Sequence, residues 1–83
     1  MSVEYYRKKL IDLRADIAKE RERKKKDNEH YASLIKNASS PSSKASYRKQ
    51  KIDRAASHDR RIESLKREVE RTKEALARER AKK

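Results

Sequence analysis

Two histidines, His30 and His58, and 14 acidic residues are the side chains of this 83-residue sequence that could ligate a metal ion or transfer a proton. Neither histidine lies in an HExxH pattern or has a second histidine one helical turn away, the spacings that zinc sites on helices use. If the chain folds back at Pro41, His30 lies opposite about residue 52, roughly 9 Å along the helix from His58. We therefore expect two surface histidines and no metal or cofactor.

Serines cluster around the single proline, at positions 39, 40, 42, 43 and 46. A serine nucleophile needs an adjacent base and a concave site that excludes water, and a long helical chain offers no such site. These serines could accept phosphate groups near basic residues, as most serine-rich turns could. We expect a protein that is not an enzyme.

The composition excludes several classes of protein. The absence of cysteine rules out disulfides and thiolate zinc sites, and leaves no sign of an oxidising compartment. The absence of glycine makes a glycine-rich phosphate loop or a hairpin-rich β fold improbable. No apolar run approaches the roughly 18 residues of a membrane span, and residues 1–7 do not resemble a signal peptide. We expect a cytoplasmic protein with no membrane contact.

One segment, from Asn37 through Pro41 to Ser43, interrupts a sequence that otherwise favours helix. Proline lacks an amide hydrogen and restrains the preceding residue, so a helix that reaches this segment should stop. Ser42 or Ser43 can cap a new helix, and Ser2 can cap the first one. The sequence predicts an all-α protein with helices at about 3–38 and 44–82 and a turn at about 39–43.

Apolar residues in both predicted helices alternate at spacings of three and four, which is typical of the a and d positions of a coiled coil. Because the helices are similar in length and the turn is short, the second helix should pack antiparallel along the first. The two apolar runs then meet at the end where both termini lie, with Leu13 near Val69. The predicted seam consists of Val3, Tyr6, Leu10, Leu13, Ile17, Ile62, Leu65, Val69 and Leu76.

The predicted seam is interrupted midway along the hairpin. The first frame places Glu20, Lys24 and Asp27 at core positions, and the facing stretch includes His58. The second frame slips, because the heptad pattern cannot hold all four apolar residues of this stretch in one unbroken frame: Ile52, Ala55, Ile62 and Leu65. We interpret this stretch as solvated or locally splayed. Two alternatives are a device that sets register or selects a partner, and a ligand site.

A two-helix hairpin covers only one side of each apolar stripe, so we expect self-association, most simply a dimer that builds a four-helix bundle. Tyr5 and Ile11 lie outside the predicted seam and would add to such a contact. The stretch from Ala75 to Lys83 contains no helix stop signal, which indicates a module of a longer protein. The main hypothesis is a non-enzymatic coiled-coil interaction and oligomerisation module that mediates self-association, binds a protein partner or positions a downstream domain.

The formal net charge of +12 supports an alternative hypothesis, nucleic-acid binding through phosphate contacts. We expect the most basic exposed region near the turn, where Tyr31 and Tyr47 could stack on bases. The candidate contacts are Arg23, Lys25, Lys26, Lys44, Arg48, Lys49, Lys51 and Arg54. Glutamates that precede a cation by four residues, such as Glu4 before Lys8, also suit an exposed helix with no partner. We assign the chain to no family from its motifs.

Overall fold

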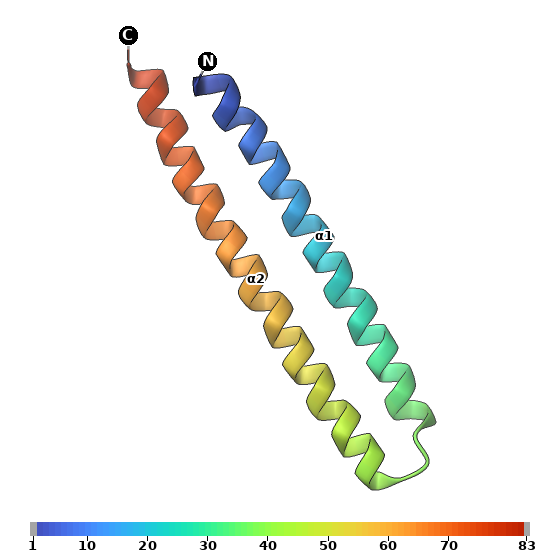
Figure 1. Ribbon diagram of the computed structural model, residues 1–83. Helices are drawn as coiled ribbons and strands as arrows, with labels where there is room; N and C mark the ends of the chain where they lie inside the picture. The colour runs from blue at the N-terminus through green and yellow to red at the C-terminus, as the bar shows by residue number, and fades with distance from the viewer. Residues whose placement is uncertain (1, 83) are drawn as a thin grey trace.

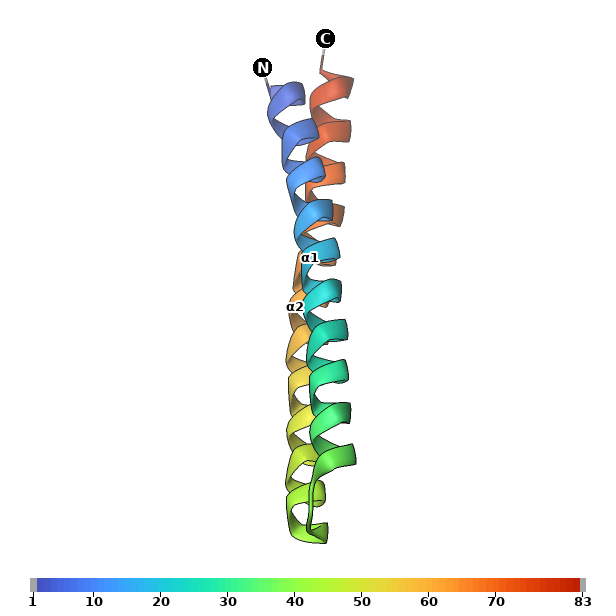
Figure 2. The same ribbon diagram turned by 90° about the vertical axis from the view of Figure 1, so that its right-hand side faces the viewer.

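The computed structural model describes residues 2–82 and contains two long helices, α1 (Ser2–Asn37) and α2 (Pro41–Ala81). The helices lie side by side in opposite directions, so the start of α1 and the end of α2 are at the same end of the rod (Figure 1). Figure 2 shows the same pairing after a 90° rotation. The described Cα atoms extend over 67 × 14 × 10 Å. The predicted all-α helical hairpin is therefore confirmed.

The turn is shorter than predicted, because α2 already begins at Pro41. Ser40 caps this helix: its backbone is extended, with φ −130° and ψ 150°, and its hydroxyl oxygen accepts a hydrogen bond from the Ser43 amide at 3.1 Å. Proline suits the first helical position, where no amide donor is needed. The prediction that Ser42 or Ser43 is the cap was wrong, since proline imposes on the preceding residue the extended conformation that a cap needs.

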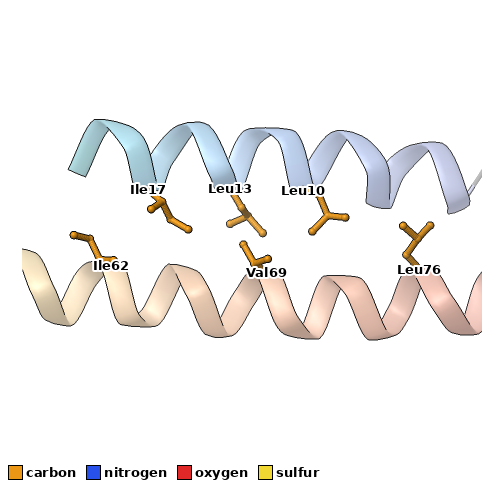
Figure 3. Close-up of a cluster of buried hydrophobic side chains, with 6 residues drawn as sticks. All are labelled: Leu10, Leu13, Ile17, Ile62, Val69 and Leu76. Carbon is orange, nitrogen blue, oxygen red and sulfur yellow. The ribbon is translucent and has the colours of Figure 1, made fainter. Parts of the chain in front are cut away.

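The core of the hairpin is a single apolar seam between α1 and α2. Figure 3 shows Leu13 of α1 opposite Val69 of α2, as the spacing predicts. Thr72 is also buried in this interface, where its hydroxyl donates a hydrogen bond to the Glu68 carbonyl oxygen at 2.7 Å. The seam contains six buried side chains, Leu10, Leu13, Ile17, Ile62, Val69 and Leu76, and three partly buried ones, Val3, Tyr6 and Leu65. These are the nine residues of the predicted seam, and here they join two helices of one chain.

The heptad frame of α2 continues without a break through the middle of the hairpin. Ile52 is 67% exposed, whereas the preceding Lys51 is half-buried and lies in frame with Ala55, His58 and Ile62. The predicted slip was wrong because it assumed that the apolar residue would take the core position. The aliphatic stem of a lysine can cover that position while its ammonium group reaches water.

Ion pairs within each helix lie on the outer faces, mostly between residues three apart. Glu4 pairs with Arg7 at 3.1 Å rather than with Lys8, and Lys8 pairs with Asp12 at 3.2 Å. Residues three and four apart are both neighbours on a helix, so either spacing can supply the pair.

Within the described residues, neither helix contains an apolar stretch that could cross a lipid bilayer.

Candidate functional site: a polar cluster in the seam

A cluster of three titratable side chains interrupts the apolar seam midway along the hairpin. Glu20 and Asp27 come from α1 and His58 comes from α2. Nε2 of His58 lies 2.6 Å from Oδ2 of Asp27, and Nδ1 of the same ring contacts Oε2 of Glu20. The Glu20 side chain is only 5% exposed and the His58 side chain 14%. We call these three residues the polar cluster.

Arginines surround the two carboxylates of the polar cluster. Oε1 of Glu20 lies 3.0 Å from Nε of Arg61 across the interface and 3.3 Å from a guanidinium nitrogen of Arg23 on its own helix. Oδ2 of Asp27 lies 3.8 Å from a guanidinium nitrogen of Arg54. A buried carboxylate is costly unless it is paired and hydrogen-bonded, and Glu20 meets both conditions.

The hydrogen bonds within the polar cluster shift the pKa of all three members. The bond to Asp27, followed by the bond to Glu20, raises the pKa of His58 above its ordinary value of 6.5. The bond to His58 lowers the pKa of Glu20 and of Asp27, although burial acts in the opposite direction on both. Both ring nitrogens of His58 face a carboxylate, whereas a neutral imidazole carries only one N–H. Only the protonated ring can donate to both α1 carboxylates, and the raised pKa of His58 favours that form.

A fifth cross-helix contact lies within this polar region. Nζ of Lys24, at the core position between Glu20 and Asp27, lies 2.7 Å from Oδ1 of Asp59. Lys24 is half-buried, and Asp59 directly follows His58 in the chain. The polar stretch therefore links α1 to α2 through ion pairs that are specific to one stagger of the helices.

Two predictions about this stretch were wrong. The stretch is not solvated or splayed at the polar cluster, and His58 is not a surface histidine, whereas His30 is exposed. The heptad frame of α2 contained the missed signal, because His58 lies four residues before the core residue Ile62 and therefore faces the predicted core position of Glu20. The partners of the His58 ring are these carboxylates and not His30.

The polar cluster links the two helices through hydrogen bonds and ion pairs. Each ring nitrogen of His58 already has a carboxylate partner, so neither offers a lone pair to a ligand. Among residues 2–82, no group of three His, Cys, Asp or Glu side chains is placed to hold a metal ion. The geometry instead suits an electrostatic clamp whose strength depends on the charge of one imidazole.

The eight candidate phosphate contacts divide into two groups. Arg23 and Arg54 pair with the carboxylates of the polar cluster, at 3.3 and 3.8 Å, which reduces their availability to an outside anion. The other six have no ion pair among the described residues: Lys25, Lys26, Lys44, Arg48, Lys49 and Lys51. Lys44 and Lys51 are half-buried, and the remaining four are exposed.

The two tyrosines that were expected to stack on bases, Tyr31 and Tyr47, differ in their accessibility. Tyr31 is buried at 9% exposure and its ring lies 5.5 Å from that of His30, so Tyr31 serves the core and cannot stack on a base. Its position in the heptad frame of α1 explains the burial. Tyr47 is half-buried near the turn and keeps part of its ring accessible.

No family model, curated protein or solved structure matches this chain. The contacts and charges of its own residues are therefore the basis for assigning a function.

Proposed function

We propose that the chain is a non-enzymatic coiled-coil interaction module that self-associates through the half of the hairpin near its termini, most simply as a dimer that forms a four-helix bundle. The observation that carries this proposal is the thinness of the core. Even the buried apolar side chains of the seam keep 7–9% of their surface exposed, because two helices cannot enclose a seam from all sides. A second copy would cover what the hairpin leaves open, and the assembled bundle could position a downstream domain.

One edge of the seam suits a second copy better than the other. On this edge Lys9 of α1 pairs with Glu68 of α2 at 3.7 Å, and Asp16 lies one heptad after Lys9, so charges of both signs are present. Tyr5, which is 61% exposed, lines a surface hollow together with Lys9. We call this the mixed-charge edge. A symmetric pair of such edges can place opposite charges across a two-fold axis.

The test is the mass of the protein in solution. Light scattering should give about twice the 9.9 kDa of one chain. Tyr5→Asp should shift the mass toward the monomer while the helicity measured by circular dichroism is retained. The matched control is Ile52→Asp, which changes an apolar side chain of similar exposure near the turn and should leave the mass unchanged. Leu13→Asp combined with Leu65→Asp should lose both dimer and helicity, and a monomeric wild-type chain at millimolar concentration would contradict the proposal.

A second candidate function is nucleic-acid binding through the half near the turn. The observation that favours it is the group of six cations without an ion pair among the described residues, which includes Lys25, Lys26, Lys49 and Lys51. Charge reversal of these four to Glu should abolish binding to structured RNA or duplex DNA that persists at physiological salt. The matched control reverses Lys19, Arg67, Arg71 and Arg78, which are exposed on outer faces. Equal losses in both variants would indicate only the general attraction of a +12 chain for phosphate.

A further inference from the structure

A groove of about 360 Å³ follows the opposite edge of the apolar seam, in the half of the hairpin near the termini. Core side chains, Ile17 from α1 and Val69 from α2, contribute to its lining. The five remaining lining residues are charged. Glu70 is the single acid, and the four cations are Arg14, Arg21, Lys66 and Lys73. We call this feature the basic groove.

The cations of the basic groove are spaced by one heptad on each helix. Arg14 precedes Arg21 by seven residues, and Lys66 precedes Lys73 by seven, a separation of about 10.5 Å along each helix axis. The same step toward the termini reaches one further cation on each helix, Arg7 on α1 and Arg80 on α2. Residues one heptad apart stay on the same side of a coiled coil. Basic side chains therefore flank this edge from both helices.

Few carboxylates neutralise these cations within the hairpin. Arg7 pairs with Glu4 at 3.1 Å and Lys73 pairs with Glu70 at 3.8 Å. Across the described residues, the salt bridges include none to Arg14, Arg21, Lys66 or Arg80. Residues that flank the seam of a coiled coil usually pair with opposite charges and thereby set partner choice. Here α1 and α2 present like charges to each other, so the complementary charge must come from elsewhere.

We propose that the basic groove binds an acidic amphipathic helix of another protein, which lies along the seam as a third helix. Apolar side chains of that helix would cover Ile17 and Val69, and its Glu or Asp residues would face the cations of both walls. Ile11, which is 66% exposed and one helical turn before Arg14, extends the apolar contact along the same side. A helix reproduces the heptad spacing of the groove because it shares the same rise per residue.

The charge of the groove argues against two other occupants. A second copy of this chain has a net charge of +12 and would bring a matching basic edge, so like charges would repel at this site. A nucleic acid would supply phosphates but no aliphatic groups to cover the apolar lining. The inference goes beyond the proposed self-association, since it concerns a different partner on the opposite edge, and a monomeric hairpin would bind the acidic helix equally well.

The first experiment keeps the protein unchanged and varies a synthetic helical peptide three heptads long. The acidic peptide carries Leu at a and d positions and Glu at e and g positions. One control peptide replaces each Glu with Lys, and a second keeps each Glu but replaces each Leu with Ser. Fluorescence anisotropy at physiological salt should show binding of the acidic amphipathic peptide, with at least tenfold weaker binding of both controls. Equal binding of the Ser peptide would overturn the proposal, because only bulk charge would then be at work.

The second experiment changes the groove. Arg14→Glu combined with Lys73→Glu should weaken binding of the acidic peptide at least tenfold and allow the Lys peptide to bind. The matched control is Lys25→Glu combined with Lys49→Glu, which makes the same change in net charge at exposed positions near the turn and should alter binding less than twofold. Equal losses in both variants, or no binding of the acidic peptide to the wild-type chain, would overturn the inference. If the chain alone is monomeric, the proposed self-association is contradicted, whereas the binding of the acidic peptide to the basic groove is unaffected.

Discussion

Nε2 of His58 on α2 lies 2.6 Å from Oδ2 of Asp27 on α1, 31 residues earlier in the chain. The other nitrogen of the ring contacts Glu20, so one imidazole ring joins two turns of the facing helix. Coiled coils usually fill this seam with apolar side chains, and here the hairpin replaces them with charges that match only in one stagger. The stability and the specificity of the hairpin should therefore depend on the protonation of a single residue.

The first prediction is that the hairpin loses stability as the solution becomes alkaline. The pKa of His58 is raised on folding, so its contribution is fully present below its unfolded pKa of 6.5 and is lost as pH rises through the higher folded value. Glu20 and Asp27 have lowered pKa values, so their contributions are lost only in acid. At constant protein concentration, the Tm measured by circular dichroism should fall as the pH rises from about 6 to about 9.

The two histidines provide a matched control for this pH dependence. His58→Gln should remove most of the alkaline decrease in Tm and should cost about 2 kcal/mol of unfolding free energy at pH 6, because charged hydrogen bonds to both carboxylates are lost. His30→Gln changes an exposed histidine and should keep the wild-type profile. An alkaline decrease that persists in His58→Gln would show that another group is responsible.

The second prediction concerns what the polar cluster contributes. Replacing Glu20, Asp27 and His58 together with Leu should leave the unfolding free energy unchanged or raise it by about 1–4 kcal/mol, because apolar packing avoids the desolvation of buried charges. If the cluster sets the stagger or selects the partner, the triple variant should sediment as a mixture of assemblies. A triple variant that remains a single species with the wild-type mass would contradict that role.

The third prediction concerns the turn. Ser40→Ala removes the hydroxyl that accepts from the Ser43 amide and should lower the unfolding free energy by about 1 kcal/mol in urea titration. Ser42→Ala changes an exposed serine two residues away and should stay within about 0.5 kcal/mol of the wild type. A larger loss of unfolding free energy in Ser42→Ala than in Ser40→Ala would mean that Ser40 is not the cap of α2.

The fourth prediction compares the stability cost of truncating a buried residue of the seam with that of truncating an exposed apolar residue. Leu13 is 8% exposed, so Leu13→Ala should cost about 3 kcal/mol through lost burial and a residual cavity. Ile11 is 66% exposed, and Ile11→Ala should change the unfolding free energy by less than about 0.5 kcal/mol. Similar costs for both variants would mean that Ile11 is buried in solution, as an additional interface would require.

The features of the turn follow from the conformational preferences of residues that are adjacent in the chain. The break at Pro41 follows from the chemistry of proline, and the sequence placed it correctly. The choice of Ser40 over its neighbours depended on the conformation that proline imposes on the preceding residue, which is also a local effect and could have been predicted. Ile52 is different, because its exposure depends on which residues α1 presents to Lys51 and Ala55.

The sequence by itself determined two helices, one turn and the nine residues of the apolar seam, because helix propensity and heptad spacing are properties of residue order along one chain. Only the tertiary structure decided that His58 meets Glu20 and Asp27, and that Arg14 and Lys73 line one groove. Both facts depend on the stagger between the helices, and a shift of one turn, about 5.4 Å, would separate these partners while leaving either helix unchanged.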